Sequence, residues 1–339
     1  MERKVYITGI GSCIMKPDDT TVPVTRENRK LMRFARTSGK LFLNALSEAV
    51  ANSGCNHIAA ENTGRRGVFF GDFMNLTTDA AHRMELFEQC KAVSGCFDEK
   101  LFLQYIIDHW SAVEVLKEVP NIPCFLAAQL TGANGPSETL LNSCASGLSA
   151  LKTGYELIRK GIIDIAYVGA GSEKTDDIER KVFASQGFFG NNDYKIVNAG
   201  AALVLESEER LKLRGGTPLA SVYSAAAAFA PDMFLRKQFD PVSAEQLIGG
   251  LHLCSDEAVR YIRGSFSRKY ADEEVQIVKK ILPAAEISVG IKETIGYSFA
   301  ASGLLEITEQ LRAEHSFGKL TVTSFGYGGY QAAVCISAE

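Results

Sequence analysis

Leu141-Asn142-Ser143-Cys144-Ala145-Ser146-Gly147-Leu148 is the stretch that decides how this chain folds. Small residues surround the cysteine, and apolar residues then recur from Leu148 to Ile158 at intervals of three or four. That interval is the signature of an amphipathic helix. The stretch therefore predicts a tight turn that places Cys144 at the N-terminus of a helix.

A cysteine in this position has two interpretations. The positive end of the helix dipole favours thiolate over thiol, and free backbone N–H groups there can bind the oxyanion formed when sulfur attacks a carbonyl. A thioester-forming nucleophile needs these features. A structural cysteine packed as a small apolar residue at the junction is the other interpretation. The motif alone supports both equally.

Composition narrows the class of protein. The chain has 339 residues, 46% hydrophobic and 22% charged, which is typical of a folded globular protein of one or two domains. A net charge of −4 argues against nucleic-acid binding, and no apolar run is long enough to predict a membrane span.

The cysteines give no indication of a metal or a cofactor. Eight are scattered along the chain without a CxxC pair, and the single short spacing, Cys90 to Cys96, has no second pair to complete a zinc site. The first residues enter a strand pattern at once and contain no signal-peptide core. We therefore expect reduced thiols and a cytoplasmic protein.

Strand patterns alternate with helical ones, which predicts an α/β fold with largely parallel pairing. Helical periodicity also covers Lys40–Val50. The predicted strands are 5–11, 67–71, 164–171, 199–206, 320–326 and 332–337.

The second half of the chain echoes the first. Ala145-Ser146-Gly147-Leu148 recurs as Ala301-Ser302-Gly303-Leu304, again at the start of an apolar-periodic helix. This repeat predicts an internal duplication, with one half over residues 1–210 and the other over 211–339. Residues 77–119 lack the strand-helix rhythm, and we interpret them as an inserted helical cap or partner-contact region. No linker separates the halves, so they should form one compact unit.

Four collinear segments make the chain resemble the β-ketoacyl synthases of the thiolase superfamily. They are the opening strand Tyr6–Gly11, the nucleophile block Gly135-Pro136 with Asn142–Gly147, the lysine block Lys292–Tyr297, and the glycine-rich loop Ser324–Ala332. The resemblance implies a five-layered αβαβα fold, a two-fold dimer, and thioesters of acyl carrier protein or coenzyme A as ligands.

The resemblance also assigns roles to residues. Cys144 would accept the acyl group, and Lys292 would support the site through an ion pair beneath it. Phe325, Tyr327, Gly328 and Gly329 match the loop that gates the acyl pocket. Simple packing explains Tyr327 equally well, and a core position is the better interpretation of Phe325.

Both histidines of the family are replaced in this chain. Tyr297 stands where the second one follows the glycine of the lysine block, and Arg263 falls at the first, in Arg263-Gly264-Ser265-Phe266-Ser267. His252 has the wrong neighbours, and His57, His82, His109 and His315 lie outside the four blocks. Asn198 replaces a glutamate that is usual in the family. Standard decarboxylative condensation is therefore in doubt, whereas acylation of Cys144 stays chemically possible.

We expect Cys144 to lie at the base of a pocket, with Arg263 and Tyr297 within reach of its sulfur. We also expect its thiol to be more reactive than those of the other cysteines, because the helix dipole lowers its pKa.

Two hypotheses about the function of the chain compete. The first is a ketosynthase-like subunit of a type II fatty acid or polyketide system that pairs with an active ketosynthase and shapes the acyl tunnel, as chain-length factors do. Those factors usually replace the nucleophile, whereas this chain keeps it.

The second is an acyltransferase or unusual β-ketoacyl synthase that uses Cys144, with Tyr297 and Arg263 in adapted roles. A degenerate scaffold that only binds acyl carrier protein is a third, weaker hypothesis. The partner should be an active ketosynthase in a heterodimer, or otherwise a second copy of the chain.

Overall fold

The computed structural model describes residues 2–16, 19, 21–22, 29–55, 62–73, 85, 87–91, 95–109, 111–173, 184–185, 193–231, 239–314 and 316–338. The strands are β1 (Val5–Ile14), β2 (Arg66–Asp72), β3 (Ser137–Leu140), β4 (Ile165–Ser172), β5 (Ala199–Ser207), β6 (Ala220–Phe229), β7 (Val259–Ile262), β8 (Glu286–Ser288), β9 (Phe317–Phe325) and β10 (Tyr330–Ala338).

The α-helices are α1 (Arg29–Met32), α2 (Thr37–Ser53), α4 (Glu99–His109), α5 (Ala112–Lys117), α6 (Ile122–Thr131), α7 (Ser146–Arg159), α9 (Glu208–Leu213), α11 (Pro241–Gly249), α12 (Ala271–Ile281) and α13 (Ser302–Ala313). Short 3₁₀ helices are η2 (Thr63–Arg65), η3 (Ser143–Ala145), η4 (Arg268–Tyr270), η5 (Gly290–Lys292) and η6 (Phe299–Ala301).

The described strands form a ten-stranded sheet whose order shows the duplication directly. The order is β3-β2-β4-β5-β1-β6-β10-β9-β7-β8. Reading outward from the β1–β6 junction, each half has an antiparallel pair, a second antiparallel pair, and then two parallel pairs. The second half therefore repeats the topology of the first, as the repeated motif predicted.

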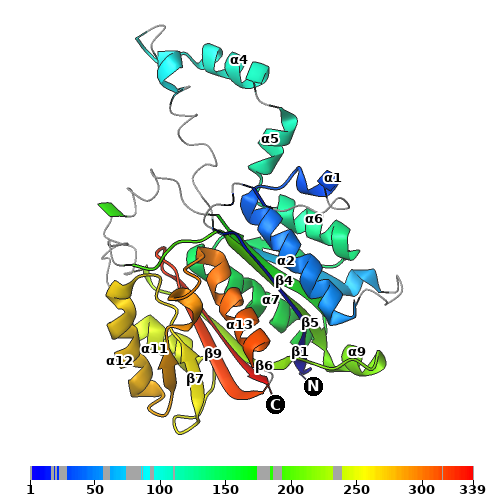
Figure 1. Ribbon diagram of the computed structural model, residues 1–339, viewed down its shortest axis with the longest axis vertical. Helices are drawn as coiled ribbons and strands as arrows, with labels where there is room; N and C mark the ends of the chain where they lie inside the picture. Colours follow the sequence, from blue (N-terminus) through cyan, green and yellow to red (C-terminus); the bar gives the residue numbers. More distant parts are fainter. Residues whose placement is uncertain are drawn as a thin grey trace.

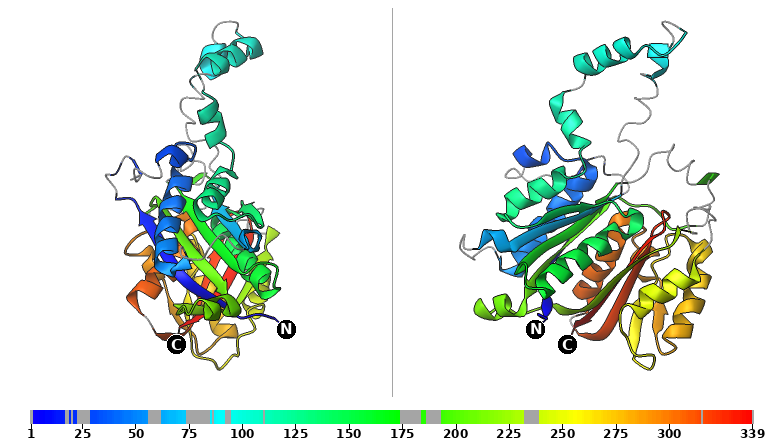
Figure 2. Two further views of the ribbon diagram at one scale, coloured as in Figure 1. Left: turned by 90° about the vertical axis from the view of Figure 1, so that its right-hand side faces the viewer. Right: turned by 180° about the vertical axis from the view of Figure 1, so that it is seen from behind.

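The two half-sheets meet only briefly. β1 and β6 pair at Tyr6–Ser221 and Ile7–Ala220 and at no other residues in the described part of these strands. Helices α7 and α13 lie between the half-sheets, α2 covers the outer face of the first, and α11 and α12 cover the outer face of the second (Figure 1; Figure 2, right). These layers are the five-layered αβαβα arrangement of the thiolase-like fold.

Close approach in the middle layer depends on glycine. A Cβ atom on Gly147 of α7 would lie 2.3 Å from the Ala300 carbonyl oxygen, and one on Gly303 of α13 would lie 2.6 Å from the Leu148 side chain. Glycine at both positions lets the starts of α7 and α13 touch. The two copies of the repeated motif therefore pack against each other and form one of the contacts between the two halves.

The strand and helix predictions are confirmed within a few residues, but the prediction of largely parallel pairing is wrong. Parallel pairs join β2 to β3 and β4, and β7 to β8 and β9, whereas the other described pairs are antiparallel. Only four residues connect β9 to β10, which is too short for the crossover that a parallel pair requires.

The predicted inserted region, about 77–119, falls partly outside the described residues. Its described helices α4 and α5 lie beyond the layered body (Figure 1). The boundary near residue 210 stays a prediction. Within the described ranges, no helix has the length and apolarity needed to cross a membrane.

Replacing Gly147 with alanine tests the contact between the halves. Because the new methyl group meets a backbone oxygen, we expect Gly147→Ala to destabilise the fold by ~1–3 kcal/mol or more in urea unfolding. Gly249→Ala is the matched control. A Cβ there would meet no atom within 4 Å, so this variant should be neutral or more stable by ~0.4–1 kcal/mol. Equal stabilities of the two variants would contradict the packing described above.

Candidate active site

The cysteine lies in a turn that two other segments hold in place. Cys144 is the middle residue of η3, directly before α7, and Ser143 before it has a left-handed φ of +56°. That conformation is disfavoured for any residue with a side chain. Ser324 at the end of β9 donates a hydrogen bond to the Cys144 carbonyl at 2.7 Å. The turn is thus fixed by both halves of the molecule.

Aromatic rings enclose the thiol, which is 1% exposed. Phe73 follows β2 and stacks on Phe299 at 4.3 Å between ring centroids, and Tyr297 meets Phe299 edge-on at 5.5 Å. The Tyr327 ring lies 5.7 Å from that of Phe73. Phe73, Tyr297 and Phe299 share one core cluster with Cys144, and Tyr327 packs against that cluster.

Burial overturns the prediction of a depressed thiol pKa. Loss of water raises the pKa of Cys144, because a thiolate is poorly solvated in an apolar enclosure. The nearby Tyr297 and Ser143 hydroxyls, and the backbone N–H groups of Tyr327 and Cys144, lower the pKa only in part. Those two N–H groups lie beside the sulfur, where they can donate to the carbonyl oxygen of a thioester as attack by the sulfur turns that oxygen into an oxyanion.

Tyr297 lies beside Cys144, as the collinear blocks predicted. Its backbone N–H donates to the Lys195 carbonyl at 2.7 Å, which fixes the residue next to the edge of β5. The hydroxyl faces the sulfur, although the geometry falls short of a full hydrogen bond and leaves the oxygen without another partner. Burial and the nearby Cys144 raise the Tyr297 pKa well above 10. Tyr297 is therefore a donor that stays protonated and cannot act as a base.

Arg263 lies near Tyr194. It follows β7, and its half-buried side chain acts on the pKa of Tyr194, whose ring lies 6.4 Å from that of Tyr297. Within the described residues, no hydrogen bond or ion pair joins its guanidinium to Cys144. The predicted approach of Arg263 to the sulfur stays a prediction.

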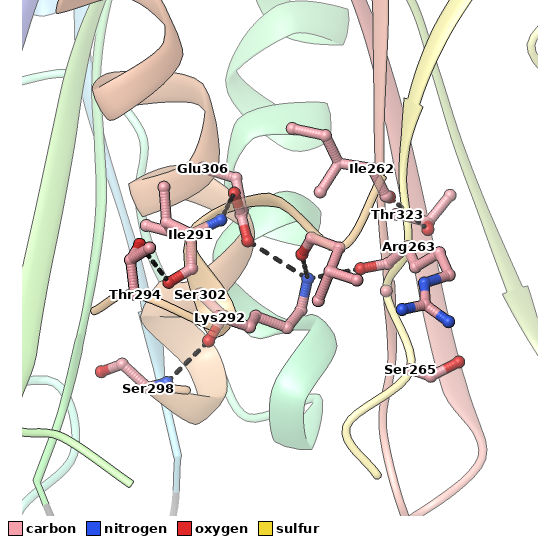
Figure 3. Close-up of polar contacts among 12 residues, drawn as sticks. Ile262, Arg263, Ser265, Ile291, Lys292, Thr294, Ser298, Ser302, Glu306 and Thr323 are labelled. Atoms are coloured by element: carbon pink, nitrogen blue, oxygen red, sulfur yellow. Dashed lines mark hydrogen bonds and ion pairs between the residues drawn. The ribbon is translucent and has the colours of Figure 1, made fainter. Parts of the chain in front are cut away.

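Lys292 forms the ion pair that was expected beneath the site. Its Nζ lies 3.2 Å from Glu306 Oε1 and donates to the carbonyls of Arg263 at 2.5 Å and Val289 at 3.1 Å (Figure 3). Both side chains are buried, and burial raises the pKa of Glu306 above its ordinary value. Lys292 therefore holds the backbone of Arg263 and does not touch the sulfur.

Glu274 is a site residue that the sequence analysis missed. Its buried carboxylate accepts hydrogen bonds from the backbone N–H groups of Gly264 at 2.8 Å and Ser265 at 2.9 Å. The side chains of Ser265, Tyr261 and Thr323 also donate to it. The available signal was its position on the apolar face of an amphipathic helix, three and four residues before Ile277 and Val278.

The glycine-rich loop has a mixed role. Phe325 is buried against Phe239 at 5.0 Å, so it packs in the core. Tyr327 supplies both its ring and its backbone N–H to the thiol enclosure. Gly328 lies next to it, and Gly329 has a left-handed φ of +88° that closes the turn into β10. Acyl binding by these four residues stays a prediction.

The remaining predicted positions lie elsewhere. His252 is exposed, and Asn198 approaches the Met15 sulfur at 3.6 Å. His57, His82 and His315, and the side chain of His109, fall outside the described residues.

The pocket expected over Cys144 stays a prediction. Among the described residues, a cavity of about 580 Å³ lies near the opposite end of α7, where Tyr155 and Arg159 line it. That cavity is remote from the thiol.

Comparisons with known proteins agree with this architecture. A sequence model of the β-ketoacyl synthase N-terminal domain matches residues 12–202. The ketoacyl synthase alpha subunit of the tetracenomycin polyketide synthase from Streptomyces glaucescens is 30% identical over 295 residues, covering 79% of this chain and 66% of that protein. The chain thus matches just under two thirds of the length of that relative.

Solved structures share the fold at low sequence identity. A type II polyketide acyl carrier protein in complex with its ketosynthase aligns with a TM-score of 0.75 and 15% identity over the whole of both chains. The ishigamide ketosynthase/chain length factor aligns with a TM-score of 0.74, also at 15% identity over both chains.

Alkylation tests the thiol environment. At pH 7.5, we expect limiting iodoacetamide to modify the exposed Cys96 and Cys254 before Cys144, because burial keeps Cys144 protonated and covered. Cys144 labelling should increase as the pH rises above 9. Peptide mass mapping measures each site, with guanidine-unfolded protein as the control in which all eight cysteines react. Labelling of Cys144 first at neutral pH would contradict this description.

Removing the Tyr297 hydroxyl tests its effect on the sulfur. Since that hydroxyl lowers the Cys144 pKa, Tyr297→Phe should move the pH profile of Cys144 alkylation upward and slow labelling roughly threefold at fixed pH. Thermal stability should be unchanged or higher, because a buried hydroxyl without a full partner is lost. Tyr155→Phe, at the other end of α7, should leave the profile unchanged. If the pH profile of Cys144 alkylation is unaltered in Tyr297→Phe, the Tyr297 hydroxyl does not stabilise the Cys144 thiolate.

Proposed function

Because this chain belongs to the β-ketoacyl synthase family, we propose that it is a ketosynthase-like subunit of a type II polyketide or fatty acid system. In this proposal it handles acyl carrier protein thioesters, pairs with an active ketosynthase in a heterodimer, and shapes the tunnel that holds the growing acyl chain. The ketosynthase complexes among the structures of the same fold support the proposal. A cytoplasmic location remains part of the prediction.

The observation that carries the proposal is that, among the described residues, no imidazole is one of the groups that interact with Cys144. Decarboxylation of a malonyl thioester develops an enolate that needs well-placed donors, and losing one such donor costs ~2.7–4 kcal/mol of transition-state stabilisation. Tyr297 supplies a donor, whereas Arg263 acts on Tyr194 and is not among the groups that act on the Cys144 pKa. Two losses do not simply add. The chain alone should therefore condense poorly.

The edge strand β3 supports pairing with another chain. In the described sheet β3 pairs only with β2, and its first residues are exposed. Such an edge presents unpaired backbone N–H and C=O groups that another strand can bind. Exposed apolar side chains lie nearby, with Phe125 on α6, which contacts β3, and Leu141 directly after the strand. A chain of the same fold offers a matching edge, so an active ketosynthase is the partner that fits.

A second function is favoured by one observation. The N–H groups of Tyr327 and Cys144 both point at the sulfur, an arrangement that a purely structural cysteine does not need. An acyl group could therefore form a thioester with Cys144 and pass to another acceptor, with Tyr297 as the hydrogen-bond donor. In this alternative the chain is an acyltransferase or an unusual β-ketoacyl synthase.

Partnership and activity can be tested together. We expect co-expression with an active ketosynthase of a type II system to give a heterodimer in native mass spectrometry. The purified chain alone should fail to extend an acyl-loaded acyl carrier protein with malonyl units. Phe125→Asp, beside β3, should disrupt the heterodimer, whereas Leu213→Asp on the remote helix α9 should not, although both residues are exposed. A stable homodimer that condenses malonyl units unaided would refute the partner-subunit role and favour the alternative.

A further inference from the structure

The repeated motif builds the same hydrogen-bonded turn twice. In one copy the Ser146 hydroxyl accepts the Asn142 backbone N–H at 2.7 Å, and in the other the Ser302 hydroxyl accepts the Ser298 N–H at the same distance. Each turn is a 3₁₀ helix whose first residue has a positive φ, +56° at Ser143 and +35° at Phe299. The first turn carries the cysteine, and the second has Ala300 in its place.

Ser146 forms two hydrogen bonds that have no counterpart at Ser302 among the described residues. Its hydroxyl oxygen also lies 2.7 Å from the Ser143 carbonyl and 2.9 Å from the carbonyl of Asp72, the last residue of β2. A hydroxyl has one proton, so it is shared between these two acceptors. Ser146 therefore ties the nucleophile turn to the strand beside it as well as closing the turn.

We propose that Ser146 is a positioning residue for Cys144. Its hydroxyl binds the backbone on both sides of the cysteine, at Asn142 N–H and at the Ser143 carbonyl, and so holds Ser143 in its disfavoured left-handed conformation. That conformation sets the direction of the next peptide unit, which brings the Cys144 N–H toward its own sulfur beside the N–H of Tyr327. Ser324 fixes the Cys144 carbonyl from the opposite side.

The chemical consequence concerns the thiolate. With Ser146 in place, two backbone N–H groups stabilise negative charge at the sulfur despite its burial. Without the hydroxyl, Ser143 is free to relax toward negative φ, and the Cys144 N–H turns away. The positioning role of Ser146 rests on the proposed function, because Cys144 is the residue that would carry the acyl group. The test below measures alkylation of Cys144 and does not require acyl transfer. The positioning role and the proposed function can therefore fail independently of each other.

Ser146→Ala and Ser302→Ala form a matched pair. Each removes one buried hydroxyl and leaves one turn N–H without its acceptor, so both should lower the melting temperature by a few degrees. The pH profile of Cys144 alkylation by iodoacetamide should shift upward in Ser146→Ala alone, with labelling roughly tenfold slower at pH 8. In Ser302→Ala the rate should stay within about twofold of the unchanged protein. Labelling of exposed Cys96 and Cys254 measures reagent activity in every sample.

A double substitution separates positioning from general destabilisation. Glycine adopts positive φ without penalty, so Ser143→Gly should make the left-handed turn independent of Ser146. In the Ser143→Gly background, adding Ser146→Ala should therefore slow Cys144 alkylation much less than it does alone. An equal loss in both backgrounds, or equal profiles for Ser146→Ala and Ser302→Ala, would overturn the proposal. If Ser146→Ala does not fold, Ser146→Thr should keep the hydroxyl and the pH profile, and a shifted profile in that folded variant would also overturn it.

Discussion

The rest of the structure depends on the contact between α7 and α13 in the middle layer. Each of these helices has a glycine as its second residue. Gly147 allows the backbone of α7 to approach the Ala300 carbonyl, and Gly303 allows α13 to pack on Leu148. Because β1 and β6 pair at only two positions, this helix contact is a second direct connection between the half-sheets. It also places the Cys144 turn at the centre of the molecule, where segments from both halves can reach it. The site around Cys144 is therefore built by residues from both halves of the duplicated fold.

Central placement has an electrostatic cost for the nucleophile. The sulfur gains two backbone N–H groups and the Tyr297 hydroxyl, yet it loses nearly all contact with water, and the loss dominates its pKa. A helix N-terminus stabilises a thiolate strongly only where solvent or a cation assists. Among the described residues, Lys292 is paired with Glu306 and Arg263 acts on Tyr194, so neither is among the groups that lower the Cys144 pKa. Burial therefore keeps the thiol protonated in this structure.

The sequence predicted much of the fold because each element carried a local signal. Alternation and helical spacing predicted β1, α2, β4 and α7, and the repeated Ala-Ser-Gly-Leu motif identified the duplication. The collinear blocks of the family resemblance, and not the repeat, predicted that Tyr297 lies beside Cys144. Strand direction was not predicted, since it depends on connections between elements. The raised pKa of Cys144 and the role of Glu274 were missed for a related reason. Both depend on burial by residues distant in the chain, such as Phe73, Phe299 and Thr323, which no local pattern specifies.

The side chain at position 263 can vary without disturbing the turn that carries it. Lys292 donates to the Arg263 carbonyl, and Glu274 accepts the backbone N–H groups of Gly264 and Ser265 and the Ser265 hydroxyl. None of these contacts involves the side chain at position 263, so that side chain can change while the turn stays in place. Tyr297 is likewise fixed through its backbone to Lys195 and Val197. The scaffold therefore fixes the positions of these two residues independently of their side-chain chemistry, which allows the fold to keep the Cys144 turn with arginine and tyrosine at the positions where the family resemblance implies histidines.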